Sequence, residues 1–296
     1  MTKSNIAILM GGPDSERDVS IRSGQAIAGA LSQSSLFEVQ SCVIDKTTTE
    51  SLRGLNSDVF FPVLHGPYGE GGPLQECLEE SGIPFVGSAS KPSRLAMDKN
   101  IAKIVAKEHG VPTPQWERVI NPADLTLELP FVLKPVDEGS SVGLAICKTR
   151  DEAAIAIKSL LCGKPFIAEQ FVEGHEITIS ILDGTPLSTI KIIPPQDIGT
   201  YDFEAKYQRN DTRYVLNPEL PKHDCVEHAL SIYEVLGLRD LARIDFIVGD
   251  GEQWFLEANT MPGFTESSLF PMAAEDCGIS MTALCERLAQ LALARG

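Results

Sequence analysis

Leu241-Ala-Arg-Ile-Asp-Phe-Ile-Val-Gly-Asp-Gly-Glu-Gln-Trp-Phe-Leu-Glu-Ala-Asn259 is the stretch of sequence around which the rest of the chain is organised. Two apolar, β-prone runs flank Gly249-Asp-Gly-Glu252, which is typical of a hairpin turn. Side chains alternate between the two faces of a strand. If the turn centres near Gly251, Asp245 lies directly opposite Glu257.

Two carboxylates that face each other in this way destabilise a strand pair unless something lies between them. A divalent cation such as Mg²⁺ would remove the conflict, because Mg²⁺ prefers oxygen ligands. On the same strands Arg243 shares the face of Asp245, and Asn259 shares the face of Glu257. The alternative is a surface hairpin with solvated acids, and a shift of one residue in register would remove the pairing of Asp245 with Glu257.

Length and composition predict a globular protein of two or three domains. The chain has 296 residues, of which 43% are hydrophobic and 22% charged. Its formal net charge of −16 argues against general affinity for nucleic acid or for anionic membranes. Seven scattered cysteines, without any Cys-x-x-Cys pair, favour a reducing cytoplasm over a disulfide framework. The apolar run Ile6–Met10 is too short for a signal peptide, and no run is long enough to span a membrane.

The first ninety residues predict an open α/β sheet. A strand at Asn5–Met10 runs into a glycine pair and a helix over 16–32, and further strands are expected at 37–44 and 59–64. Ligands of such sheets bind beyond the carboxyl ends of the strands. Glu16 and His65 follow two of these strand ends, so both are candidates to face one cleft. Taken alone, each is explained more simply, as a helix-terminal acid and as a turn histidine.

The middle of the chain carries a possible phosphate-binding loop. A helix over 96–109 precedes two strands, 130–135 and 144–147, which flank a loop with glycines and serines at 136–143. No Gly-x4-Gly-Lys-Ser/Thr motif occurs, but backbone N–H groups with Ser140 and Ser141 could still surround phosphates, and Lys134 could add charge. The alternative is an ordinary glycine-serine hairpin loop, since such loops are common.

Two acids bracket the next predicted turn. Glu169 and Glu176 lie on either side of Glu173-Gly174 within an apolar strand pair spanning 166–182. Carboxylates at such a strand edge can accept hydrogen bonds from an amine or from sugar hydroxyls. The alternative is a solvated turn.

The last third combines an irregular stretch, a polar loop and a final helix. Residues 194–218 show little periodicity and are expected to form a lid or to be disordered. After the hairpin, 262–271 is expected to be a loop that offers backbone N–H groups and Ser268. The final helix, over 280–294, has an apolar face that is explained most simply by core packing.

Seven motifs, in order along the chain, carry a resemblance to a known family. They are Gly11-Gly-Pro-Asp-Ser-Glu-Arg-Asp-Val-Ser-Ile-Arg-Ser-Gly24, His65-Gly-Pro-Tyr-Gly-Glu70, Met97-Asp-Lys99, Lys134-Pro135 with Gly139-Ser-Ser-Val-Gly143, Tyr201-Asp-Phe-Glu-Ala-Lys-Tyr207, Arg243-Ile-Asp245 and Leu256-Glu-Ala-Asn-Thr-Met-Pro-Gly-Phe-Thr-Glu-Ser-Ser-Leu269. Over nearly its whole length the chain resembles the D-alanine–D-alanine ligases of the ATP-grasp superfamily.

The resemblance implies a mixed α/β fold with three domains, at 1–89, 90–171 and 172–296. The first would be an open α/β domain, and ATP would lie between two antiparallel sheets of the other two. The implied reaction joins two D-alanines for peptidoglycan precursors, through an acyl phosphate, in a cytoplasmic homodimer.

The resemblance also implies site roles, position by position. ATP would contact Lys99, Lys134, Ser141, Glu169 (at adenine), Glu176 (at ribose) and Lys206. Two Mg²⁺ ions, replaceable by Mn²⁺, would bind Asp245, Glu257 and Asn259. The D-alanines would contact Val19, His65, Ser268 and Leu269. Arg243 and the Gly263 N–H would hold the oxyanion, and Glu16, Ser140 and Tyr207 would form a latch.

Three departures from the family pattern stand out. Asp14 replaces a usual serine, Gly71 a usual aspartate and Phe203 a usual tyrosine. The first two flank the implied site of the first substrate. Two alternatives are a ligase that uses D-serine or D-lactate and a nucleotide-binding module without catalysis. The second alternative would be expected to lose Arg243 or a metal-binding acid, and all are present.

Overall fold

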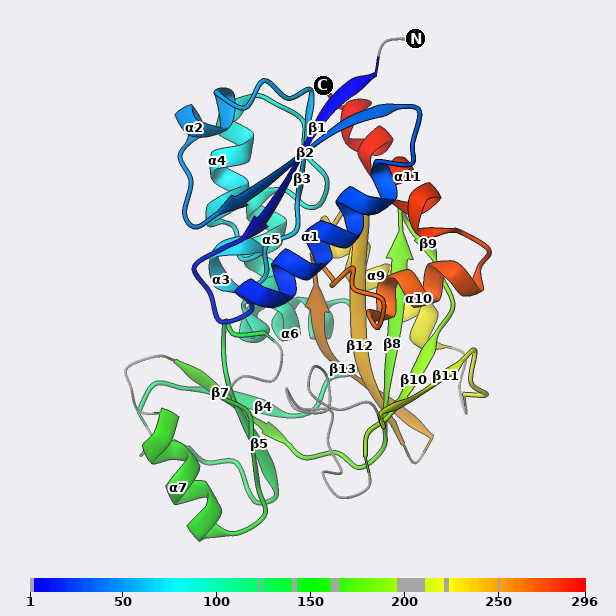
Figure 1. Cartoon of the computed structure of the whole chain (residues 1–296). Helices are drawn as coiled ribbons and strands as arrows, with labels where there is room; N and C mark the ends of the chain where they lie inside the picture. Colours follow the sequence, from blue (N-terminus) through cyan, green and yellow to red (C-terminus); the bar gives the residue numbers. More distant parts are fainter. Residues whose placement is uncertain are drawn as a thin grey trace.

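A computed structural model of the chain describes residues 3–121, 123, 125–139, 143–160, 165–195, 211–220, 224–249 and 251–296. Within these ranges the strands form three sheets, each drawn from a different part of the sequence (Figure 1). The sheet of the first part lies at the top of the view, and the other two sheets lie below it.

The N-terminal sheet is parallel, with strand order β2-β1-β3. Its strands are β1 (Ser4–Gly11), β2 (Phe37–Ile44) and β3 (Val59–Pro62), and its helices are α1 (Arg17–Leu31), α2 (Thr49–Arg53), α3 (Gly66–Gly69) and α4 (Pro73–Ser81). The Ser20 hydroxyl accepts from the Gly11 N–H at 2.8 Å and donates to the Val63 carbonyl at 2.7 Å. The start of α1 is therefore fixed beside the carboxyl ends of β1 and β3.

The second sheet is antiparallel, with strand order β4-β7-β5-β6. Its strands are β4 (Trp116–Val119), β5 (Phe131–Pro135), β6 (Ala145–Cys147) and β7 (Phe166–Gln170), and α7 (Arg150–Leu160) packs on it. Two helices, α5 (Ser90–Met97) and α6 (Lys99–Glu108), connect it to the N-terminal part. The Asp98 carboxylate caps α6 by accepting from the Ile101 N–H at 3.0 Å.

The third sheet is also antiparallel, with order β11-β10-β8-β12-β13 and β9 added beside β8. Its strands are β8 (His175–Leu182), β9 (Thr185–Pro186), β10 (Ile190–Ile193), β11 (Arg213–Leu216), β12 (Leu241–Gly249) and β13 (Glu252–Asn259). The C-terminal helices are α9 (Asp224–Val235), α10 (Leu269–Asp276) and α11 (Met281–Leu293). Helix α9 covers one face of this sheet.

The β12–β13 hairpin pairs Asp245 with Glu257 as predicted, but a β-bulge, and not the position of the turn, sets this register. Asp245 lies opposite Glu257 and Arg243 opposite Asn259, but at the turn Gly249 pairs with Glu252. A turn with that pairing would place Asp245 out of register with Glu257 by one residue. A β-bulge between Asp245 and Phe246 restores the alignment.

The largest hydrophobic core joins the two ends of the chain. Residues of β1, α1 and β3 pack in one cluster with α10 and α11, and Phe61 meets Phe264 edge to face at 5.7 Å. Figure 1 shows α11 lying beside α1 and the N-terminal sheet. Near the end of the chain Arg295 binds the buried Asp240 through two hydrogen bonds of 2.6 Å. The final helix is core packing, as predicted, but the core belongs to the N-terminal sheet.

Two predictions of irregular structure were wrong in part. Residues 213–216 within the predicted irregular stretch form β11, which pairs with β10, because a neighbouring strand edge can order a segment of weak periodicity. In the predicted loop 262–271 helix α10 begins at Leu269, with Pro271 in its first turn, where proline costs no hydrogen bond. Short elements such as α3 and β4 were not predicted.

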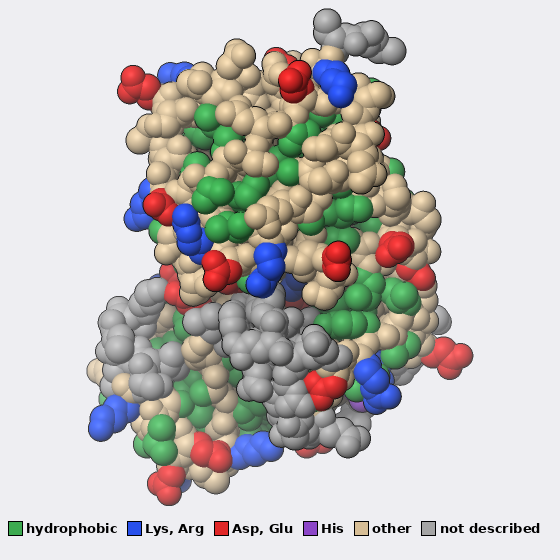
Figure 2. All heavy atoms as spheres, viewed as in Figure 1, with side chains coloured by type: hydrophobic (Ala, Val, Ile, Leu, Met, Phe, Trp, Pro, Cys, Tyr) green, Lys and Arg blue, Asp and Glu red, His purple; other side chains and the backbone are tan. Residues whose placement is uncertain are grey.

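Over the described ranges, no helix is both long and apolar enough to cross a membrane. On the face drawn in Figure 2, lysine and arginine side chains are dispersed among acidic ones and form no continuous basic stripe within the part of the chain that is described.

Candidate active site

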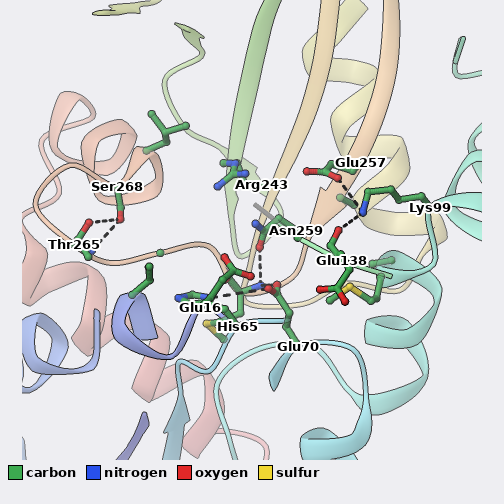
Figure 3. A pocket seen from close by; sticks show the side chains of 18 of the residues that line it. Glu16, His65, Glu70, Lys99, Glu138, Arg243, Glu257, Asn259, Thr265 and Ser268 are labelled. Carbon is green, nitrogen blue, oxygen red and sulfur yellow. Dashed lines mark hydrogen bonds and ion pairs between the residues drawn. The ribbon is translucent and has the colours of Figure 1, made fainter. Parts of the chain in front are cut away.

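An open cavity collects most of the predicted site residues that the structure describes (Figure 3). It lies where the N-terminal sheet, α6 and the β12–β13 hairpin meet. The predicted residues that line it are Glu16, Val19, His65, Lys99, Arg243, Glu257, Asn259, Gly263, Ser268 and Leu269. Segments from the two ends and the middle of the sequence therefore face one space.

The hairpin forms one wall of the cavity and holds its charges in two separate groups. The Arg243 guanidinium donates to both carboxylate oxygens of Asp245, at 3.0 and 2.9 Å, and the Thr178 hydroxyl donates to the same carboxylate at 2.6 Å. Across the strand pair, Glu257 forms an ion pair with Lys99 at 3.4 Å. The two opposed carboxylates therefore each have a cationic partner, which reduces their mutual repulsion.

Asp245 itself is buried and does not belong to the lining of the cavity. Its neighbour Arg243 and its cross-strand partner Glu257 both do. Asp245 therefore supports the wall from behind in this structure, by fixing the guanidinium of Arg243.

The chemistry of this hairpin suits a hard cation. Asp245, Glu257 and Asn259 all offer oxygen donors from two paired strands, the ligand type that Mg²⁺ prefers. Among the described residues, no group of three or more His, Cys, Asp or Glu side chains is placed to hold a metal ion. Three side-chain donors are fewer than the six ligands that Mg²⁺ takes, so a cation held by them would also need other ligands, such as phosphate oxygens and water.

The opposite wall comes from the N-terminal sheet. His65 is buried, and its Nδ1 lies 3.1 Å from the Met261 carbonyl and 4.0 Å from a carboxylate oxygen of Glu70. Burial lowers the pKa of His65, although the nearby Glu16 charge opposes this. Burial also raises the pKa of Glu70 to about 8. Both groups are therefore held mainly uncharged near neutral pH.

Glu70 lines the cavity but was not among the predicted site residues. Its carboxylate accepts from the Gly66 and Met261 N–H groups, at 3.2 and 3.3 Å. The signal was present in the sequence, because Glu70 ends the quoted motif that begins at His65. Its side chain ties the N-terminal wall to the segment that follows the hairpin.

The loop after the hairpin forms the third side of the cavity. The Ser268 hydroxyl accepts from the Thr265 N–H at 2.9 Å and lies 2.8 Å from the Thr265 hydroxyl. A Cβ on Gly263 would lie 2.8 Å from the Ser268 hydroxyl, so a larger residue would displace that group. Leu269 then begins α10. The loop therefore presents backbone and hydroxyl groups together at the cavity.

Four predicted site residues lie outside the described residues: Ser140, Ser141, Lys206 and Tyr207. The loop that carries the serines is described up to Gly139, which lines the cavity. A Cβ on Gly139 would lie 3.2 Å from a carboxylate oxygen of Glu16. The base of the serine loop therefore lies against Glu16.

Lys134 and Glu169 contact each other but do not line the cavity. Lys134 donates to Glu169 at 2.9 Å, and the second oxygen of the same carboxylate forms an ion pair with Lys103. Burial alone would raise the pKa of Glu169, but the charges of Lys103 and Lys134 lower it below its ordinary value. Lys103 was missed, although it lies four residues after Lys99 and so on the same helical face.

Glu176 and two of the family departures, Asp14 and Gly71, also lie outside the lining. Glu176 is the second residue of β8 and is paired with Ile247 of β12. The Asp14 carboxylate accepts from the Tyr68 N–H at 2.9 Å. A Cβ on Gly71 would lie 2.4 Å from the Pro67 carbonyl oxygen. Phe203 lies outside the described residues.

Comparison with known proteins gives a consistent result. A family model described as D-ala D-ala ligase C-terminus matches residues 104–290, and one described as D-ala D-ala ligase N-terminus matches residues 47–88. The chain belongs to the D-alanine–D-alanine ligase family. A D-alanine–D-alanine ligase of Aquifex aeolicus is 40% identical over 286 residues, covering 94% of this chain and 97% of that protein.

Solved structures of the family share the fold. The D-alanine–D-alanine ligase of Bacillus anthracis, complexed with ATP, superposes with a TM-score of 0.84 at 31% identity, covering 100% of this chain and 98% of that chain. The VanG D-Ala:D-Ser ligase of Enterococcus faecalis gives a TM-score of 0.83 at 25% identity, covering 98% of this chain and 99% of that chain. The chain therefore has the mixed α/β ATP-grasp fold predicted from its motifs.

Proposed function

We propose that this protein joins two D-alanines to D-alanyl-D-alanine at the expense of ATP, as a step in making peptidoglycan precursors. The observation that carries the proposal is the cavity, which places Lys99, Arg243 and Glu257 opposite Glu16 and His65. The cavity therefore has one wall with cationic groups that suit a nucleotide and an opposite polar wall that suits an amino acid. Family membership supports the same reaction.

The reaction concentrates negative charge, and the cavity supplies groups that stabilise it. The carboxylate of the first D-alanine would attack the γ-phosphate of ATP, releasing ADP and giving an acyl phosphate. The amine of the second would displace phosphate to form the peptide bond. Preorganised donors lower the barrier of such steps. In the proposal Arg243 and the Gly263 N–H face the developing oxyanion, and Lys99 faces the phosphates.

The other assignments are carried over from the family motifs. Asp245, Glu257 and Asn259 would hold two Mg²⁺ ions, or Mn²⁺, which would neutralise phosphate charge. Val19 and His65 would contact the first D-alanine, and Ser268 with Leu269 the second. Glu169 would accept from the adenine amine, Glu176 from the ribose, and Lys134, Ser141 and Lys206 would contact phosphates. Glu16, Ser140 and Tyr207 would close the site.

The proposal extends to organisation and location. We take 1–89, 90–171 and 172–296 as three domains, with ATP between the two antiparallel sheets, in a cytoplasmic homodimer. Support for the division comes from the three sheets, which fall in separate parts of the sequence.

A phosphate-release assay tests the function directly. Purified protein with ATP and Mg²⁺ would be given D-alanine, D-serine and D-lactate, alone and in pairs, and products would be identified by mass spectrometry. We expect phosphate release with D-alanine alone and a product with the mass of the dipeptide. Absence of ATP-dependent phosphate release with D-alanine would contradict the proposal. A preference for a mixed pair would assign the second site to D-serine or D-lactate.

A further inference from the structure

Lys103 is a buried cation that connects the two antiparallel sheets. Its side chain has no exposed surface. Its Nζ donates to the Thr113 hydroxyl at 2.8 Å and to the Phe255 carbonyl of β13 at 3.1 Å, and it forms an ion pair with Glu169 of β7. Because β7 and β13 belong to different sheets, one ammonium group fixes how these two strands lie relative to each other.

Glu169 has two lysine partners, one at each oxygen of its carboxylate. Lys134 lies on β5 and pairs with one carboxylate oxygen, while Lys103 pairs with the other. In the proposed function Lys134 contacts phosphate. When it does so, Lys103 becomes the cation that balances the Glu169 charge. Each carboxylate oxygen has two lone pairs, so an oxygen held by a lysine can still accept another hydrogen bond.

We propose that Lys103 is a positioning residue that keeps Glu169 ionised and thereby makes the site select adenine over bases with a 6-keto group. This inference rests on the proposed function, because it assumes that Glu169 faces the base. An ionised carboxylate only accepts, so it matches the amine of adenine. A protonated carboxyl also donates, and so would match the keto oxygen of hypoxanthine or guanine.

Burial makes the charge of Glu169 dependent on its neighbours. A carboxylate removed from water loses its charged form unless a cation stands beside it. The groups that face Lys103 are Glu169, Lys134, Thr113, the Phe255 carbonyl and, at longer range, Glu257. Consistent with this setting, burial lowers the pKa of Lys103 to about 8, and Glu169 is the main charge that opposes the shift.

The test compares ATP with inosine triphosphate, whose base has a keto group in place of the amine. We expect Lys103→Met to lower the ratio of kcat/KM for ATP to that for inosine triphosphate by at least about tenfold, with KM for D-alanine unchanged. The matched control is Lys107→Met. Lys107 lies one turn further along α6 and its side chain is exposed, so this substitution should leave the ratio unchanged.

An unchanged ratio of the two kcat/KM values would overturn the inference, whether activity is retained with both nucleotides or lost equally with both. If Lys103→Met does not fold, the double variant Lys103→Met/Glu169→Gln replaces the ion pair by neutral groups. The amide introduced at position 169 can donate or accept, so the ratio of kcat/KM for ATP to that for inosine triphosphate should approach one. A ratio like that of the unmodified protein would overturn the inference. Failure of the unmodified protein to use ATP with D-alanine would instead contradict the proposed function.

Discussion

Helix α6 carries two lysines of the same face whose ion pairs differ in setting. Lys99 pairs with Glu257 at 3.4 Å on the cavity wall, where the Glu257 side chain is 26% exposed. One turn later Lys103 pairs with Glu169, and neither side chain is more than 4% exposed. The partly solvated pair can exchange partners when a ligand enters, whereas the sealed pair holds the sheets together. Equal spacing on a helix therefore does not imply equal roles.

The largest effect is expected from breaking the cavity pair on its acidic side. Glu257→Gln should lower turnover by at least about 10³-fold, because it removes a charge from the wall that faces the phosphates. The melting temperature should stay close to that of the unmodified protein, since Glu257 is partly solvated. Turnover and thermal unfolding measured on the same preparation check this. Near-normal turnover would refute the metal role of Glu257.

The stability difference between the two lysines is the next largest effect. Lys103→Met should reduce the free energy of unfolding by about 3–5 kcal/mol, because it leaves a buried carboxylate with one cationic partner fewer. Lys99→Met should cost only about 1 kcal/mol, because its partner remains in contact with water. Urea denaturation of both variants measures the two values. Equal losses would mean that the pairs are equivalent in stability.

Glu70 extends the comparison to a buried carboxylate whose pKa moves in the opposite direction from that of Glu169. Burial raises the pKa of Glu70 to about 8, whereas two lysines lower that of Glu169. Native Glu70 retains a proton that the unfolded chain releases, so its contribution to stability should fall as pH rises from about 4.5 to 8. Glu70→Gln should remove most of this fall, which amounts to roughly 3–5 kcal/mol for a shift of this size. Denaturation midpoints across that range test it, and an unchanged slope would contradict it.

The smallest effect concerns the hydroxyl that supports Asp245. Thr178→Val should cost about 1 kcal/mol of stability, because one buried hydrogen bond to a carboxylate is lost while Arg243 keeps its two. Thermal unfolding measures the change. A loss as large as that expected for Lys103→Met would show that Asp245 depends on the hydroxyl more than on the guanidinium.

The sequence motifs predicted the fold class, and most of their described site residues line one cavity, but local features around that cavity were not predicted. The opposed pair Asp245–Glu257 followed from alternation along two strands, and the motifs located the walls of the cavity. The bulge beside Asp245 could not be predicted, because its signal lies in the pairing between strands. Strand β11 was missed because its order comes from β10. Lys103 was missed because Glu169, with which it forms an ion pair, lies far away in the sequence.

The shared core of α11 and the N-terminal sheet has a consequence for synthesis of the chain. Domains often fold as they emerge, from the N-terminus onwards. Here the apolar faces of α1 and β3 are covered by α10 and α11, which are translated after both antiparallel sheets. The first part of the chain therefore emerges with its core incomplete, and its apolar faces remain exposed until these two helices have been translated.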